Sequence, residues 1–409
     1  MSENNELQYS KLSKDITKSL TKKDKKDNGI FFTPPSTVAE NIDMISDYIE
    51  DNIDILEPSC GSGEYITQLN NRYPNSRITG VEFNETIYNQ IEHLNKIDNV
   101  TIFNADFLKY KDFNKYDLII GNPPYFVMKK SELDKKYYDY FDGRPNIFIP
   151  FIIDSLNMLK PNGILSFVLP KNFINSLYYD KTRKYITDNF TIVKVVEMTD
   201  NYLETQQDTV IIIIQNTPDQ SQEQNGEFVL YKHDFTIFME TGKLDTIYDL
   251  LSNTKSLDEL GFTVSVGKVV WNQKKSILTD DNSKTRLIYS SDIVKNKLSI
   301  KSYANPSKKN YIDMDGFSEP TLVINRGYGK GAYKFSYAII DVNYPYQIEN
   351  HLIEIKCNEN WSRKKLLAAY KKIVNSLNNH KTTKFVNLYF GNNAINTTEL
   401  AYILPIYGF

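Results

Sequence analysis

The stretch DILEPSCGSG (54–63) combines the features that decide the fold: a short apolar run, a sharp turn and the start of a helix. DILEP (54–58) is typical of a strand, and the segment after Gly63 of a helix. Gly61 and Gly63 let the backbone approach a ligand closely, because a Cβ there would collide with it. The third glycine of the dinucleotide-binding fingerprint is absent, so the turn alone is weak evidence for a nucleotide site.

The same pattern of apolar runs and amphipathic stretches continues along the chain. Further strands are expected at 77–83, 100–106, 116–122, 164–170, 191–198 and 209–216. Helices are expected after residue 83 and at 148–159, where Lys160-Pro161-Asn162-Gly163 would end the helix. Strands that alternate with helices favour a mostly parallel sheet covered on both faces. The predicted fold class is therefore α/β, with a Rossmann-like sheet of about seven strands.

Acidic residues stand where two of these strands end. Glu82 ends the second strand, 19 residues after Gly63, and there a carboxylate can accept hydrogen bonds from both hydroxyls of a ribose. Asp106 ends the third strand, with Phe107 beside it to pack on an adenine ring. Since ligands of parallel sheets bind at the carboxyl edge, these residues predict a nucleoside site. Surface acids on loops are the alternative interpretation.

The segment IIGNPPYF (119–126) is the most informative in the chain. An apolar strand runs directly into Asn122, Pro123, Pro124 and Tyr125, and two consecutive prolines fix φ and exclude helix. Asn122 supplies a side-chain carbonyl, Pro123 a backbone carbonyl and Tyr125 a flat face. Two acceptors beside an aromatic plane suit an amino group on a heteroaromatic ring. A rigid turn after a core strand is the alternative, although Pro-Pro there is otherwise poorly motivated.

Adenine N6 is an amino group of this kind. Its lone pair is delocalised into the ring, so the nitrogen is a poor nucleophile. Hydrogen bonds accepted from both N–H groups return electron density to the nitrogen, and stacking holds the ring in place. Positioning and electrostatics would then supply most of the catalysis, without a general base.

Six segments, in this order, resemble the gamma-class amino-methyltransferases of DNA, and especially the TaqI-like adenine methyltransferases. They are FFTPP (31–35), LEPSCGSG (56–63), GVEF (80–83), NADF (104–107), LIIGNPPY (118–125) and GILSFVLPKNF (163–173). The resemblance implies methyl transfer from S-adenosylmethionine, with no metal, to N6 of an adenine flipped out of double-stranded DNA. It also implies a restriction–modification system, in which a separate cognate endonuclease is a possible partner, or an orphan methylase.

The resemblance carries roles to individual residues of this chain. The cofactor residues that it implies are Phe32, Thr33, Glu57, Pro58, Ser59, Gly61, Gly63, Glu82, Phe83, Asp106, Phe107, Asn122 and Phe151. Asn122, Pro123, Pro124 and Tyr125 would hold the target adenine. The family has a phenylalanine on the far face of the flipped base, and here Tyr179 falls at that place, with Tyr178 as the alternative and as a DNA contact.

Charge is distributed unevenly. Residues 261–390 hold 21 Lys and Arg against 10 Asp and Glu, whereas the whole chain has a net charge of −3. A basic C-terminal part suggests a polyanionic partner, although a solvated basic face would look the same. We expect a flexible arm at 1–28, a catalytic domain at 29–245 and a DNA target-recognition domain at 246–409. Arg326, Lys330 and Lys334 are the basic residues selected there as DNA contacts.

Other features limit the remaining classes. Cys60 and Cys357 are far apart, and the four histidines lack metal-ligand spacing, so neither a disulfide framework nor a metal is expected. No signal peptide or apolar run of membrane-spanning length is evident, which favours a cytoplasmic protein without a membrane partner. An RNA or protein-glutamine methyltransferase with the same NPPY core remains the main alternative function. A DNA-binding module without activity and a fused nuclease at Asp341 and 354–356 are further alternatives.

Overall fold

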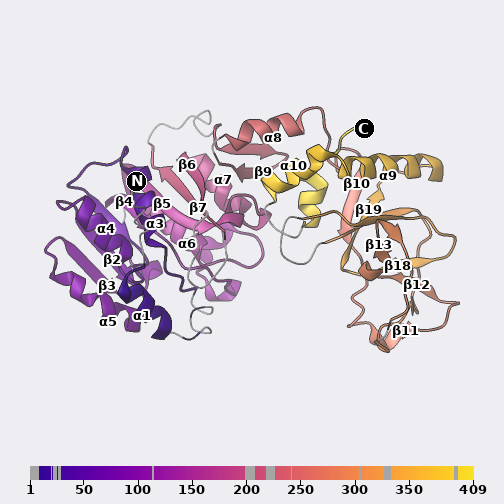
Figure 1. Cartoon of the computed structure of the whole chain (residues 1–409), viewed down its shortest axis with the longest axis horizontal. Helices are drawn as coiled ribbons and strands as arrows, with labels where there is room; N and C mark the ends of the chain where they lie inside the picture. The colour runs from indigo at the N-terminus through magenta and orange to yellow at the C-terminus, as the bar shows by residue number, and fades with distance from the viewer. Residues whose placement is uncertain are drawn as a thin grey trace, which may run out of the picture. The chain divides into compact units, whose positions relative to one another are not determined.

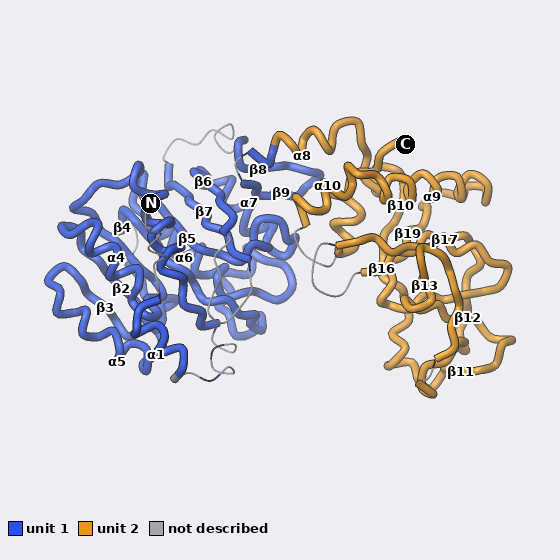
Figure 2. The backbone as a smooth tube through the Cα atoms, in the orientation of Figure 1, with its two compact units in different colours: residues 1–244 blue, residues 245–409 orange. Residues whose placement is uncertain are grey.

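The computed structural model describes residues 9–19, 21, 25, 29–112, 115–198, 208–217, 226–240, 242–303, 305–326, 333–390 and 395–409. The chain forms two compact units, unit 1 at Met1–Leu244 and unit 2 at Asp245–Phe409 (Figure 2).

Unit 1 is built on a seven-stranded sheet of order β3-β2-β1-β4-β5-β7-β6. The strands are β1 (Asp54–Glu57), β2 (Arg77–Glu82), β3 (Val100–Asn104), β4 (Tyr116–Gly121), β5 (Leu159–Pro170), β6 (Thr191–Met198) and β7 (Thr209–Gln215). Strand β7 runs antiparallel to both of its neighbours, and the other pairs are parallel. The predicted mostly parallel Rossmann-like sheet is therefore confirmed.

Helices cover both faces of this sheet (Figure 1). They are α3 (Pro35–Ile45), α4 (Glu64–Arg72), α5 (Glu85–Ile91), α6 (Phe148–Met158) and α7 (Asp180–Asn189). Residues of α6 and α7 form one apolar cluster with one face, and residues of α3, α4 and α5 form another with the opposite face. Successive strand residues separate accordingly, because strand side chains alternate: Leu56 lies in the first cluster and Ile55 in the second.

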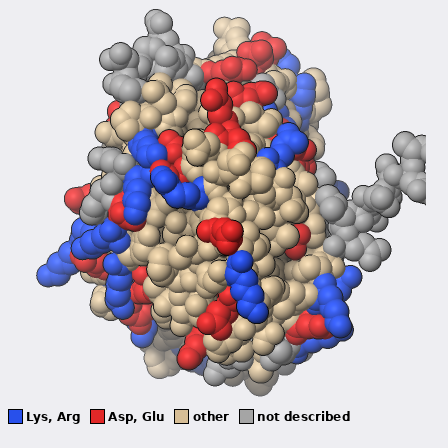
Figure 3. Space-filling model, turned by 90° about the vertical axis from the view of Figure 1, so that its left-hand side faces the viewer, with Lys and Arg blue, Asp and Glu red and all other residues tan. Residues whose placement is uncertain are grey.

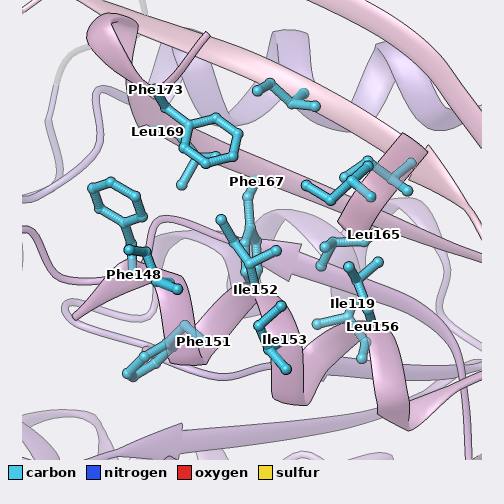
Figure 4. Packing of buried hydrophobic residues seen from close by; sticks show 14 of the residues in the cluster. Ile119, Phe148, Phe151, Ile152, Ile153, Leu156, Leu165, Phe167, Leu169 and Phe173 are labelled. Carbon is cyan, nitrogen blue, oxygen red and sulfur yellow. The ribbon is translucent and has the colours of Figure 1, made fainter. Parts of the chain in front are cut away.

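The cluster beneath α6 is dense and aromatic (Figure 4). Phe148 and Ile152 of α6 and Phe167 of β5 are at most 1% exposed, and Ile119 of β4 is fully buried. A helix that is apolar on nearly all sides suits this place, because every residue of α6 except Asn157 is buried. The core therefore fixes the strands whose carboxyl ends carry the predicted site.

The start of β5 differs from the prediction. The Lys160-Pro161-Asn162-Gly163 segment was expected to be a turn between a helix and a strand at 164–170, but β5 already begins at Leu159. Its pairing with β4 shifts register between Tyr116 and Leu118, and Asn162 has a φ of +66°. The turn residues are thus accommodated as an irregularity within the strand.

The flexible arm expected at 1–28 also differs from the structure in part. Residues Lys11–Ser19 form helix α1, in which Ile16 is only 3% exposed. Ser10 precedes the helix, and its Oγ accepts a hydrogen bond from the Ser13 amide at 3.0 Å, as an N-cap does. The helix forms because Ile16 packs against Phe32 and Ile87 of unit 1.

Unit 1 ends in a hairpin of β8 (Val229–Lys232) and β9 (Phe235–Phe238), and α8 (Lys243–Leu251) leads into unit 2. Unit 2 has two four-stranded sheets, β10-β19-β16-β17 and β11-β15-β12-β18, and a β13-β14 ribbon. The first sheet comprises β10 (Phe262–Val266), β16 (Thr321–Asn325), β17 (Tyr337–Ile340) and β19 (Leu352–Cys357). The other strands are β11 (Leu278–Thr279), β12 (Thr285–Ile288), β13 (Ile293–Val294), β14 (Lys297–Leu298), β15 (Tyr311–Ile312) and β18 (Tyr346–Ile348). The helices are α9 (Arg363–Leu377) and α10 (His380–Tyr389).

The two acidic residues considered for a fused nuclease each form an ion pair with a basic residue of unit 2. Asp341 lies 2.5 Å from Arg363, and the buried Glu354 lies 2.6 Å from Lys356. Among the described residues, no three His, Cys, Asp or Glu side chains gather as metal ligands do. In the described part of the chain, no helix has both the length and the apolar character of a membrane span.

Candidate active site

The glycine turn after β1 is held against the end of β2. Gly61 and Gly63 have φ values of +52° and +72°, in the left-handed region that favours glycine. The amide of Gly61 donates to Oε2 of Glu82 at 2.8 Å, and the amide of Asn84 donates to Oε1 at 2.7 Å. Burial raises the pKa of Glu82 to about 7, and these hydrogen bonds act against that rise. A hydrogen bond therefore joins the glycine turn to the acid that was predicted beside it.

A cavity of about 540 Å³ opens at this edge of the sheet. Ten of the residues predicted for the cofactor line it: Phe32, Pro58, Ser59, Gly61, Glu82, Phe83, Asp106, Phe107, Asn122 and Phe151. Pro124 of the predicted catalytic segment lines it as well. The carboxyl ends of β1, β2 and β4 thus contribute to one cavity, as the strand-end argument expects.

Three predicted cofactor residues do not line the cavity. Glu57 is 2% exposed, and burial, followed by the charges of Glu82 and Glu64, raises the pKa of its carboxyl. Its Oε2 has no hydrogen-bond partner within the described part of the chain. Thr33 is 9% exposed and accepts a hydrogen bond from Asn122 Nδ2 at 3.0 Å, and Gly63 is the residue that precedes α4.

Part of the cavity wall is aromatic. The rings of Phe107 and Phe151 lie with their centroids 4.8 Å apart, and Phe83 exposes 72% of its surface. The carboxylate of Asp106 accepts from the amide of Leu108 at 3.1 Å and pairs with Lys109 at 3.3 Å. Aromatic side chains beside a carboxylate are what an adenine ring would require.

Part of the cavity wall consists of residues that no sequence motif marked. The cavity is also lined by Gly29, Ile30, Phe31, Asn84, Ile87, Ala105, Leu108, Lys109, Phe126, Met128, Glu132, Leu133, Asp134, Lys136, Tyr137 and Ile147. Tyr137 and Lys136 are held by buried Asp154, which accepts from the Tyr137 hydroxyl at 2.5 Å and pairs with Lys136 at 3.1 Å. The run KKYYDYF (135–141) carries many aromatic residues, but its short 3₁₀ turns follow no motif that would mark it as a wall.

The segment after β4 ties several distant parts of unit 1 together. Ser59 Oγ donates to the backbone oxygen of Asn122 at 3.1 Å. The Tyr125 hydroxyl lies within hydrogen-bond distance of Asn122 Oδ1 and, at 2.7 Å, of the Val168 carbonyl. Gly29 packs beneath Tyr125, since a Cβ on Gly29 would lie 2.6 Å from the Tyr125 nitrogen. Pro123 is buried, so only part of the predicted Asn-Pro-Pro-Tyr element faces the cavity.

The two tyrosines considered for the second aromatic face have opposite environments. Tyr179 is 9% exposed and packs on Phe148 and Phe173, with ring centroids 5.0 and 5.8 Å away. Burial raises the pKa of its hydroxyl. Tyr178 is 62% exposed. Tyr125 also packs edge-on against Phe148, at 6.2 Å, and neither Tyr178 nor Tyr179 lines the cavity.

The residues selected as DNA contacts belong to unit 2. Lys334 is exposed, and Arg326 is half-buried with its backbone bonded to His351 and Ile395. Lys330 falls outside the described residues. On unit 1, Lys and Arg side chains are interspersed with Asp and Glu over the face shown in Figure 3.

Comparison with known proteins adds independent findings. The family model for the Eco57I restriction-modification methylase matches residues 65–203. The modification methylase CviBIII of Paramecium bursaria Chlorella virus NC1A is 35% identical over 215 residues, 52% of this chain and 56% of that protein. The type II methyltransferase M.CvrRI of Paramecium bursaria Chlorella virus XZ-6E is 28% identical over 406 residues, 97% of this chain and 98% of that protein.

Two further matches are to a tRNA-modifying enzyme and to a solved structure. The tRNA1(Val) (adenine(37)-N6)-methyltransferase of Glaesserella parasuis is 30% identical over 130 residues, 28% of this chain and 51% of that protein. A methyltransferase subunit of the type I restriction-modification system of Streptococcus thermophilus superposes with a TM-score of 0.39 and 19% identity, over 55% of this chain and 54% of that one. The predicted resemblance to the methyltransferases of restriction–modification systems is therefore confirmed, and the similarity to a type II methyltransferase extends through both units.

Proposed function

We propose that this chain is a site-specific DNA methyltransferase that transfers a methyl group from S-adenosylmethionine to N6 of an adenine flipped out of double-stranded DNA. One observation carries the proposal: Asn122 and Pro124 line the same 540 Å³ cavity as the glycine turn and Glu82. A methyl donor bound along the turn and an amino group held by Asn122 would then share one space. Transfer between them requires this proximity.

The residues of the cavity fit S-adenosylmethionine. Glu82 would accept hydrogen bonds from the ribose hydroxyls, and Phe107, Phe151 and exposed Phe83 would enclose the adenine. Glu57 ends β1 and does not itself line the cavity. Its Oε2 has no hydrogen-bond partner among the described residues, and a turn of the side chain toward the cavity would let a cationic amino group of the methionyl part supply one. When bound, the cofactor supplies a methyl group on a sulfonium.

The target adenine would be held by the segment after β4. Asn122 Oδ1 and the Pro123 carbonyl would accept hydrogen bonds from the N6 amino group, and the Tyr125 ring would stack on the base. The N6 amino group would replace the Tyr125 hydroxyl, which already lies within hydrogen-bond distance of Asn122 Oδ1. Extruding the base costs a few kcal/mol, which stacking offsets. For the second aromatic face, the exposed Tyr178 is the better supported choice, because Tyr179 is packed in the core.

Unit 2 would hold the DNA, with residues 246–409 as the target-recognition domain. Helices α9 and α10 support this role, because residues 363–389 contain seven Lys and Arg and no Asp or Glu. On α9, Leu366, Tyr370 and Ile373 are buried, whereas Lys364, Lys365, Lys371 and Lys372 are exposed. Lys364 and Lys372 stand about 12 Å apart along the helix. A one-sided row of lysines suits a phosphate backbone.

We predict that the double variant Lys371→Ala/Lys372→Ala weakens DNA binding and lowers the slope of log affinity against log salt by about two, since each phosphate contact contributes about 0.9. Fluorescence anisotropy between low and moderate salt measures this slope. The matched control, Lys96→Ala/Lys184→Ala, removes two exposed lysines of unit 1. An unchanged slope in the first variant would remove these helices from the proposed DNA interface.

The main alternative is an RNA adenine methyltransferase, which the match to a tRNA enzyme favours. That match spans 28% of this chain, whereas the type II relative spans 97% and thus includes the basic unit 2. DNA is therefore the better supported substrate. By analogy with type II systems, a cognate endonuclease would be a separate protein.

Transfer of a labelled methyl group to a mixture of DNA, RNA and protein tests the proposal. We expect label in N6-methyladenine of duplex DNA, and label confined to RNA or protein would refute it. Asn122→Ala should abolish transfer while S-adenosylmethionine still binds, because Asn122 holds the acceptor amino group. Asn71→Ala, an exposed position of α4, is the control and should retain full activity. Turnover retained in Asn122→Ala contradicts the role of that residue.

A further inference from the structure

Helix α1 contacts the back of the cavity wall. Ile16 of α1 belongs to one apolar cluster with Phe32 and Ile87, and both of these residues line the cavity. Figure 1 shows α1 beside α5, the helix that carries Ile87. Tyr9, directly before the helix, donates its hydroxyl hydrogen to the Phe32 carbonyl at 3.3 Å. The helix therefore packs on residues whose other sides face the cavity.

A second contact reaches the glycine turn itself. Ser13 is 1% exposed, and its Oγ donates to Oγ of Ser62 at 2.8 Å. Ser62 stands between the two glycines of the turn and is 8% exposed. Phe32 packs on the same turn from the side, since a Cβ on Gly61 would lie 3.4 Å from its ring. Both contacts of α1 thus end at Gly61–Gly63.

The helix depends on this surface for its own stability. It has nine residues, and isolated helices shorter than about 12–15 residues are marginal in water. Its anchors are Ile16 and Ser13, with the partly buried Leu12 beside them, whereas Lys11, Asp15 and Lys18 are exposed. A ligand that orders the glycine turn and Phe32 would stabilise the docked helix, and by reciprocity the docked helix would strengthen binding of that ligand.

We propose that α1 is a positioning element of the cofactor site, in which Ser13 and Ile16 hold the glycine turn and Phe32 in the binding geometry. This inference rests on the proposed function, since it assigns the cavity to S-adenosylmethionine. It extends the cofactor site to residues 9–19, which do not line the cavity themselves. The helix acts on affinity for the cofactor and not on the transfer step.

The test uses full-length point variants and calorimetric titration with S-adenosylmethionine and, separately, S-adenosylhomocysteine. Ile16→Asp should weaken binding of both about tenfold, and Ser13→Ala about fivefold, within the usual range of coupling between sites. Turnover at saturating cofactor should stay within about twofold of the wild type, so that KM for the cofactor changes and kcat does not. The control Lys18→Asp places the same carboxylate on the exposed side of the helix and should leave affinity unchanged.

Hydrogen exchange separates positioning from simple loss of fold. In the wild type, S-adenosylhomocysteine should slow exchange of the amides of 9–19 as well as those of 61–63, and in Ile16→Asp the amides of the central sheet should keep their protection. If Ile16→Asp and Ser13→Ala both bind the two nucleosides with wild-type affinity, the inference about α1 is overturned and the proposed function is not affected. Failure of the wild type to bind either nucleoside overturns the inference and the proposed function together.

Discussion

Replacing Glu82 by glutamine tests the electrostatics of the site. The carboxylate is 7% exposed and accepts hydrogen bonds from two backbone amides, at Gly61 and Asn84. Burial nevertheless raises its pKa from 4.5 to about 7, because desolvation of the charge outweighs those bonds. The ionised form that would bind a ribose is therefore costly to keep in the folded protein without a ligand.

The sign and size of the effect follow from the two pKa values. Between pH 4.5 and about 7 the carboxyl is protonated in the folded chain and ionised in the unfolded chain, so folding is favoured at the low end of this range. Stability is lost as the pH rises from 4.5 to the folded-state pKa of about 7, at about 1.4 kcal/mol for each pH unit, which amounts to about 3 kcal/mol, and the loss levels off above that pH. Most of this loss falls between pH 5 and pH 8. Glu82→Gln removes this dependence.

Hydrogen exchange of the β1 and β2 amides measures the effect in unit 1. Fluorescence is unsuitable, because Trp271 and Trp361 both belong to unit 2. The opening free energy of the wild type should fall by about 2–3 kcal/mol more than that of Glu82→Gln between pH 5 and pH 8. S-adenosylhomocysteine should bind the wild type about tenfold more weakly at pH 6 than at pH 8, since binding requires the ionised carboxylate. Glu82→Gln should bind S-adenosylhomocysteine weakly at both pH values.

Glu85→Gln is the matched control, because Glu85 is exposed in the first turn of α5 and should leave both measurements unchanged. Equal pH slopes for the wild type and Glu82→Gln would refute the raised pKa. A pH-independent affinity in the wild type, with a normal stability slope, would instead refute the ribose contact.

Two further substitutions probe the turn and the base site. Gly80→Ala should lower unfolding free energy by about 1–3 kcal/mol, because its Cβ would lie 2.5 Å from Cys60 Sγ in the sheet interior. Denaturant titration measures this, and Cys60→Ala should rescue most of the loss; no rescue would place the strain elsewhere. Tyr125→Phe keeps the ring and should retain most of the kcat/KM on DNA, whereas Tyr125→Ala should lose about 10- to 100-fold in the same quantity, as expected for one stacked base. Equal losses in both variants would assign the role to the hydroxyl bonded to Val168 and not to the ring.

Sequence patterns alone were sufficient for the sheet and for the part of the cavity wall that lies at the strand ends and the Asn122–Tyr125 segment. Strands that are buried on both faces form continuous apolar runs, as in β4 and β7, and such runs are visible without any long-range information. Glu82 and Asp106 could be placed because parallel strands end at a common edge. The Asn122–Tyr125 element stands out since its prolines restrict the backbone locally.

Tertiary structure decided the features that depend on contacts between distant segments. The lysine-rich sequence of helix α1 by itself indicates a solvated arm. In the structure the helix is held by the packing of Ile16 against Phe32 and Ile87. Tyr178 and Tyr179 are identical neighbours in the chain, and only the packing of Phe148 and Phe173 makes one a core residue and leaves the other exposed. Burial and hydrogen bonding are properties of the assembled surroundings, so local periodicity could not determine them.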